Sequence, residues 1–157
     1  ITERKRVEAE LSKLSSAVQQ IADSLMITSK DGAIEYVNPA FEKLTGYAKE
    51  EIIGQTPRVL KSGEHNEAFY QAVWKTILSG DVFRGVFINR KKSGELYHEE
   101  KTITFLRDSQ GNITHFVSAG RDITERRRTE EALRQAEEKY RTIFENAVVG
   151  IFQTTPD

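Results

Sequence analysis

The stretch from Ser24 to Thr124 constrains the fold most, because short strand-like runs in it are cut by turn signals. Two runs, residues 25–28 and 34–38, flank Asp31-Gly32, a dipeptide typical of tight β-hairpins. Later strand-like runs are separated by "KKSG" and "DSQG" and cover residues 82–90, 95–106 and 112–122. Strands joined by such short turns pair antiparallel. The order of strands, then helices, then strands predicts an α+β fold.

Helical patterns fill the space between the first two strands and the last three. "PAFEKLTGYAKEEIIG" predicts two short helices, each ended by a glycine, Gly46 and Gly54. "NEAFYQAVWKTILSG" predicts a longer helix, because Phe69, Val73 and Ile77 recur at helical spacing and share one face. These helices are expected to cover the sheet.

Heptad-spaced helices are predicted on both sides of this stretch. "ITERKR" at residue 1 and "ITERRR" at residue 123 each precede a charged run with apolar residues at alternating steps of three and four. The first seam contains Val7, Leu11, Leu14, Val18, Ile21 and Leu25, and the second contains Leu133, Ala136, Tyr140, Ile143 and Ala147. The pattern predicts coiled-coil-type connectors and a homodimer. The alternative is that each helix packs its stripe on its own domain.

Composition excludes several kinds of chemistry. The chain has 157 residues and no cysteine, which removes disulfides, thiolate metal sites and cysteine nucleophiles. A formal net charge of -1 argues against a nucleic-acid partner. No apolar run reaches the roughly 18 residues of a membrane span, so no direct membrane insertion is expected. The expected location is the cytoplasm, either free or as the cytoplasmic part of a membrane-bound sensor. Phosphate-binding loops and hydrolase motifs are absent, so no enzymatic activity is predicted.

Four phrases resemble the PAS family in content and in order: "YVNPAFEKLTGYAKEEIIGQ", "VFINRKKSGELYHEE", "DSQGNITHFVSAG" and "DIT". The resemblance implies the PAS fold, a five-stranded antiparallel sheet with short helices on one face and a small cavity between them. It also implies a bacterial signalling protein. The expected division is a connector helix at 1–23, a PAS domain at 24–124, a second connector at 125–146 and the start of a following PAS module at 147–157. The chain is thus expected to be a segment of a longer protein.

Alternation along two strands predicts which side chains share a face of the sheet. Gly85, Phe87 and Asn89 share one face of their strand, as do Glu99 and Lys101 on the next. By resemblance, Asn89 and Glu99 look inward. A buried polar group needs a partner, so these two either contact a ligand or satisfy each other, Lys101 or water.

The segment "GQTPRVLK" bears on the cofactor. Light-sensing PAS relatives, the LOV domains, use Gly-x-Asn-Cys-Arg-Phe-Leu-Gln around a flavin; here Arg58 is retained, but Pro57 stands at the reactive cysteine. We therefore expect no photoactive LOV domain. "VWKTI" and "NRKKSG" resemble the PAS domains of bacterial redox regulators that bind FAD without a covalent bond. The cofactor stays open between none and non-covalent FAD. The candidate pocket residues are Arg58, Trp74, Gly85, Phe87, Asn89 and Glu99.

Trp74 has two interpretations: it lies along the cavity near a flavin ring, or it is an ordinary large core anchor. Haem is not favoured. His65, in "GEHNE", is expected to be exposed at the start of a helix, and His98 and His115 fall on the outward faces of their strands. No two histidines are close enough in sequence to suggest a metal site.

The "DIT" triplet is the predicted relay from the sheet to the second connector. Asp122, Ile123 and Thr124 form it, with Thr124 placed as the N-cap of the helix. The predicted function is perception of a small ligand or redox state, relayed through the connectors to an output domain of the same chain, such as a histidine kinase or diguanylate cyclase. The alternative is a ligand-free PAS spacer that mediates dimerisation.

Overall fold

The computed structural model describes residues 2–153 and divides into two compact units, Ile1–Asp122 and Ile123–Asp157. The first unit contains α1 (Thr2–Gln20), β1 (Ser24–Ser29), β2 (Ile34–Val37), α2 (Pro39–Thr45), α3 (Lys49–Ile52), the 3-10 helix η1 (Pro57–Leu60), α4 (Glu67–Leu78), β3 (Phe83–Arg90), β4 (Leu96–Arg107) and β5 (Ile113–Asp122). The second is the helix α5 (Thr124–Gln153). Every strand and helix predicted between Ser24 and Asp122 is present, and η1 was not predicted.

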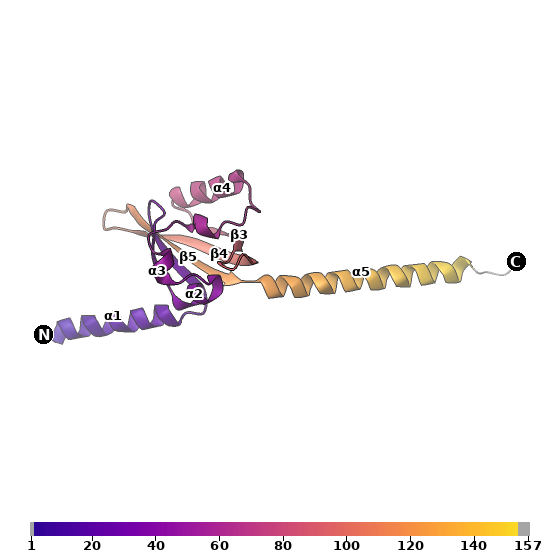
Figure 1. Ribbon diagram of the computed structural model, residues 1–157, viewed down its shortest axis with the longest axis horizontal. Helices are drawn as coiled ribbons and strands as arrows, with labels where there is room; N and C mark the ends of the chain where they lie inside the picture. Colours follow the sequence, from indigo (N-terminus) through magenta and orange to yellow (C-terminus); the bar gives the residue numbers. More distant parts are fainter. Residues whose placement is uncertain (1, 154–157) are drawn as a thin grey trace. The chain divides into compact units, whose positions relative to one another are not determined.

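The five strands form one antiparallel sheet in the order β2-β1-β5-β4-β3. The predicted α+β class and the five-stranded antiparallel sheet are therefore confirmed. The last strand in the sequence, β5, lies in the centre between β1 and β4 (Figure 1). Strand β3 is an edge strand, which leaves one side of its backbone without a neighbouring strand.

Residues on the inner face of the sheet and on the short helices form the core. The main apolar cluster comprises Met26, Ile34, Val37, Phe41, Ile52 and Leu60. Helix α4 lies beside β3 and β4 and buries Val73 and Ile77, as the helical spacing predicted, while Phe69 is half-buried (Figure 1). The helices and the sheet thus enclose a space. Its walls are formed by side chains at helical spacing on α4 and by alternate side chains of the strands.

The buried side chain of Asn38 ties the end of the first connector to α2. Its Oδ1 accepts hydrogen bonds from the amides of Phe41, at 3.0 Å, and Leu25, at 2.9 Å. Its Nδ2 donates to the carbonyl of Asp23, at 2.9 Å, and more weakly to that of Ile21, at 3.5 Å. Because these backbone groups bond to Asn38, they do not continue a helix. The predicted seam is therefore wrong at its last two positions, since α1 ends before Ile21 and Leu25 lies in β1.

The connector helices leave their apolar seams exposed. In α1 the side chains of Val7, Leu11 and Leu14 are all more than half exposed, and the helix has no buried residue. The alternative in which this helix packs its stripe on its own domain is wrong for α1.

Helix α5 extends beyond the predicted end of the second connector. Residues 147–153, expected to begin a following module, continue the helix, and residues 154–157 lie outside the described part of the chain. The start of a further module there stays a prediction. Within residues 2–153, no helix combines the length and the apolar character needed to cross a membrane.

Candidate functional site

A cavity of about 520 Å³ lies between α4, η1 and the inner face of the sheet. Apolar and aromatic side chains make most of its wall: Met26, Leu60, Val73, Trp74, Ile77, Phe87, Ile103 and Phe116. Polar groups from separate elements join them: Thr28, Arg58, Lys61, Tyr70, Asn89, Lys101 and Ser118. A mostly apolar cavity of this size with a few polar groups is typical of a small-molecule site.

Three polar residues form a buried cluster on β3 and β4. Asn89, Glu99 and Lys101 are 4%, 4% and 6% exposed. The Asn89 amide donates to Glu99 Oε2 at 3.4 Å, and Lys101 Nζ lies 3.7 Å from Glu99 Oε1. The period of two along a strand places Glu99 and Lys101 on the same face, as predicted. Of the two predicted roles for Asn89 and Glu99, their pairing with each other is present in the structure.

Gly120 on β5 makes the room that this cluster needs. It lies opposite Lys101 in the sheet, and a Cβ at this position would overlap the carboxylate of Glu99. A glycine is therefore required here by close approach and not by an unusual φ angle. The carboxylate fills the place where a side chain from β5 would otherwise stand.

Two buried tyrosine hydroxyls lack a hydrogen bond of acceptable geometry among the described residues, those of Tyr70 and Tyr97. Tyr97 is 1% exposed; burial raises its pKa far above the ordinary value, and the neighbouring Glu99 carboxylate raises it further. Burial also raises the pKa of Tyr70, which lines the cavity and carries Lys61 Nζ 4.0 Å above its ring. Both phenols are neutral donors at physiological pH.

The six predicted pocket residues do not all reach the cavity. Arg58, Trp74, Phe87 and Asn89 line it, with Arg58 exposed at its rim. Gly85 and Glu99 do not line it: Gly85 lies under the ring of Phe83, and Glu99 packs against Gly120. Sequence reasoning missed Tyr70, although its spacing of three and seven residues from Val73 and Ile77 marks the same face of α4.

Trp74 is not an ordinary core anchor, because it is 41% exposed. Val73 and Ile77 occupy the buried face of α4, and Trp74 is rotated about 100° from Val73 around the helix. Its ring contacts Phe116 edge-on, with centroids 6.0 Å apart, and lies next to Gly32 in the β1–β2 turn. Trp74 thus forms part of the cavity rim and remains accessible to solvent.

His65 is half-buried, and the expectation that it is exposed is wrong. Its Nε2 accepts a hydrogen bond from the amide of Ile88 at 2.8 Å, on edge strand β3, and its ring stacks on Phe69 with centroids 3.8 Å apart. Because an amide can only donate, this Nε2 is unprotonated. Burial lowers the pKa of His65, His98 lowers it further, and Glu64 opposes the shift.

The last residue of the sheet before the second connector is paired with a member of the polar cluster. Asp122, the last residue of β5, lies opposite Glu99. Ile123 and Thr124 are both buried, and α5 begins at Thr124. The carbonyl of Ile123 accepts the first helical hydrogen bond, from Arg127 at 2.9 Å, so Ile123 holds the N-cap position predicted for Thr124.

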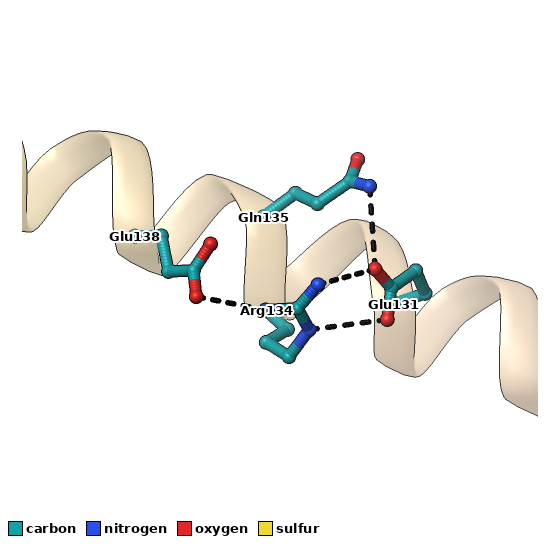
Figure 2. Close-up of polar contacts among 4 residues, drawn as sticks. All are labelled: Glu131, Arg134, Gln135 and Glu138. Carbon is teal, nitrogen blue, oxygen red and sulfur yellow. Dashed lines mark hydrogen bonds and ion pairs between the residues drawn. The ribbon is translucent and has the colours of Figure 1, made fainter.

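Helix α5 carries a charged ridge on one face. Arg134 donates to both oxygens of Glu131, at 3.1 and 2.6 Å, and to Glu138 at 2.7 Å, while Gln135 also donates to Glu131 (Figure 2). These hydrogen bonds hold the pKa of Glu131 below its ordinary value. The charged groups of this ridge pair with one another, so they stabilise the helix without a partner from another segment.

The apolar seam occupies the other side of α5. Leu133, Tyr140 and Ile143 are all at least 59% exposed and lie roughly 100–180° around the helix from Arg134 at 100° per residue. The rings of Tyr140 and Phe144 stack along this side with centroids 6.3 Å apart. A helix with a satisfied polar face and an exposed apolar face has the form of a coiled-coil partner.

No group of three or more histidine, aspartate or glutamate side chains within residues 2–153 could hold a metal ion. The candidate functional site is the cavity together with the polar cluster of Asn89, Glu99 and Lys101.

Comparison with known proteins adds a family and several relatives. The family model described as PAS fold matches residues 12–123. The chain is 34% identical over 117 residues to a nitrogen fixation regulatory protein of Klebsiella oxytoca, covering 74% of this chain and 24% of that protein. It is 33% identical over 112 residues to a blue-light-activated histidine kinase of Brucella canis, covering 69% of this chain and 23% of that protein. The chain thus spans about a quarter of the length of these curated relatives.

A solved structure with the same fold is an RNA-binding light-oxygen-voltage receptor. It superimposes with a TM-score of 0.73 and 27% sequence identity, covering 81% of this chain and 37% of the receptor. The comparisons therefore give no support to separating this chain from the LOV group.

Proposed function

Because the chain belongs to the PAS family, we propose that it is a sensory module that binds a small molecule in its cavity and passes the bound state to an output domain through its connector helices. The observation that carries this proposal is the cavity of about 520 Å³ with Asn89 and Lys101 buried in its wall. A structural spacer has no need for such a space, because unfilled volume and buried polar groups both reduce stability.

We propose a flavin bound without a covalent bond as the cofactor, because "VWKTI" and "NRKKSG" resemble FAD-binding PAS domains and the chain is similar to a blue-light-activated histidine kinase. Aromatic side chains line the cavity and suit a planar ring system. The chain contains no cysteine, so a flavin here forms no cysteinyl adduct on illumination. We infer chemistry distinct from that of an adduct-forming LOV domain.

An absorption spectrum of the purified protein, followed by mass spectrometry after denaturation, tests the proposal. Flavin bands near ~450 nm and the mass of FAD or FMN are expected if the flavin assignment is right. A colourless sample that contains another small molecule would contradict the flavin assignment but support the sensing function. The absence of any bound molecule, and of binding when flavins are added, would favour the spacer.

A matched pair of variants locates the bound molecule. Ile103 lines the cavity, whereas Thr102 precedes it on β4 and faces the other side of the sheet. Ile103→Trp is expected to displace the ligand, and Thr102→Trp, which adds the same side chain outside the cavity, is expected to retain it. Equal retention by the two variants would place the ligand elsewhere.

The alternative function, a ligand-free spacer that mediates dimerisation, is favoured by one observation, the exposed seams of α1 and α5. A homodimer through the connectors is compatible with both functions, and we propose it for both. Leu14→Lys and Leu133→Lys each place a charge in a seam and are expected to weaken association in light scattering. Gln135→Lys adds a charge on the opposite side of α5 and is the control. A wild-type chain that stays monomeric at high concentration would contradict the proposed homodimer.

The relay is proposed to run through Asp122, Ile123 and Thr124, because they join the strand opposite the polar cluster to the first turn of α5. Asp122→Ala is expected to uncouple output from ligand in the full-length protein while leaving ligand binding unchanged. Unchanged signalling by this variant would contradict the relay. The output domain, proposed to be a histidine kinase or a diguanylate cyclase, lies outside this chain.

A further inference from the structure

Lys101 is a buried cation that pairs with Glu99 but makes no hydrogen bond of normal length to any residue between 2 and 153. Its side chain is 7% exposed and lines the cavity from β4. Among the described residues its polar contacts are the Glu99 carboxylate at 3.7 Å, which is beyond hydrogen-bonding distance, and the ring of Phe87 at 4.7 Å from the ammonium. An ammonium carries three donors, and a buried donor without an acceptor is costly. Lys101 therefore has capacity for an acceptor that the protein itself does not supply.

Tyr70 presents a second unused donor from another element. Its hydroxyl is buried, has no hydrogen-bond partner among residues 2–153 and belongs to a side chain that lines the same cavity from α4. A phenylalanine would fill the same space without an unsatisfied hydroxyl. The two groups come from the sheet wall and the helix wall, and no hydrogen bond joins them among residues 2–153.

The space between the two donors is aromatic. Phe87, Phe116 and Trp74 line the cavity together with aliphatic side chains. Such walls favour a flat, apolar ring system, while the donors require oxygen acceptors on its edges. A cationic ligand is disfavoured, because it would place a second positive charge beside Lys101.

We propose that Lys101 and Tyr70 are the groups by which the cavity selects its ligand, and that the ligand is a planar aromatic molecule with oxygen acceptors on its edge, the most electron-rich of which faces the Lys101 ammonium. This rests on the proposed sensing function and adds the ligand class and two recognition residues. The carbonyl-bearing ring of a flavin and the carboxylate of a small aromatic acid share this chemistry.

Three probes test the proposal: FAD, 2-naphthoate and 2-naphthylmethylamine. Their binding to the full chain is measured by Trp74 fluorescence and by calorimetry. FAD and naphthoate distinguish the two sources of the acceptor edge, and the amine keeps the naphthalene ring but replaces the acceptor with a cation. At least one of the two acceptor probes is expected to bind, and the amine is expected to bind at least roughly 10-fold more weakly than naphthoate. Tighter binding of the amine would overturn the proposal.

Three variants assign the recognition to residues. Tyr70→Phe removes only the hydroxyl. It is expected to lower the affinity for the probe roughly 5-fold without lowering the thermal midpoint of the ligand-free protein. The double variant Glu99→Gln/Lys101→Met removes both charges, so no lone carboxylate is left buried. It is expected to lower the affinity for the probe roughly 10- to 100-fold. Glu99→Gln alone keeps the ammonium and is expected to bind as tightly as the wild type or more tightly.

The outcomes separate this inference from the proposed function. Wild-type affinity retained by both Tyr70→Phe and the double variant would overturn the assignment of these residues while leaving a ligand-binding module. If no molecule accompanies the purified protein and neither FAD nor naphthoate binds, the sensing function itself falls, and this inference with it.

Discussion

Replacement of Asn38 by alanine is expected to be among the most destabilising single changes in the first unit. Asn38 is 0% exposed, and its side chain bonds to backbone groups on both sides of the β1–β2 hairpin. Alanine fits the space but supplies neither an acceptor nor a donor. The amides of Leu25 and Phe41 and the carbonyl of Asp23 each lose a partner.

The magnitude follows from these contacts. The bond to Phe41 is the N-cap of α2, and loss of a cap costs about 1 kcal/mol. The amide of Leu25 is left without a partner in a partly buried position, which costs about 1–3 kcal/mol. The free energy of unfolding is therefore expected to fall by roughly 2–4 kcal/mol. In a chain of this size each kcal/mol lowers the melting temperature by about 2–4 °C.

Asn66 provides the matched control, because it is also an asparagine N-cap but makes one exposed bond, to the amide of Phe69 at 3.0 Å. Asn66→Ala is expected to cost about 1 kcal/mol or less. Urea unfolding of both variants can be followed by the fluorescence of Trp74, the single tryptophan, which lies on α4 and reports on the unit that contains the sheet. Equal losses for the two variants would refute the assignment of tertiary hydrogen bonds to Asn38.

Further predictions concern the cluster, the sheet edge and the second connector. Gly120→Ala is expected to cost about 1–3 kcal/mol because the new methyl group overlaps Glu99, and to cost less when it is made in a Glu99→Ser background, as measured by urea unfolding; an equal cost in both backgrounds would contradict the overlap. Burial holds the pKa of His65 below its ordinary value, and the neutral Nε2 accepts a hydrogen bond from β3. The contribution of His65 to stability is therefore present above about pH 6.5, the unfolded pKa, and is lost as the pH falls through the lower folded pKa. His65→Gln should therefore flatten the pH dependence of the urea midpoint below that pH, and an unchanged slope would argue against the linkage. Arg134→Ala is expected to reduce the helicity of α5 slightly in circular dichroism, with a difference that shrinks in high salt; a salt-independent difference would show that the ridge is not electrostatic.

Local periodicity predicted most of the fold. The strands expected at 82–90, 95–106 and 112–122 are present at Phe83–Arg90, Leu96–Arg107 and Ile113–Asp122. Alternation also identified the inward face that carries Asn89, Glu99 and Lys101. These features depend on neighbouring residues along the chain, whose geometry repeats every two residues in a strand and every 3.6 in a helix.

Contacts between distant segments decided the rest. No local signal places His65 against Ile88, which is 23 residues away, or ends α1 through a side chain 17 residues from Ile21. Of the two interpretations of Trp74, the core anchor is wrong, because the position of Trp74 on α4 turns its ring to the cavity rim. Such outcomes depend on which segments pack together.

The amino-acid sequence by itself determined the class of fold, the bounds of the five strands to within a few residues, the shared face of Glu99 and Lys101, and the absence of cysteine chemistry. Only the tertiary structure decided that β5 lies between β1 and β4, that Gly120 makes room for Glu99, and that Lys101 and Tyr70 line one cavity from different elements. The physical reason is that secondary structure follows from torsional and hydrophobic patterns within one segment. A binding site requires side chains from several segments to converge, and their distances exist only once those segments have packed.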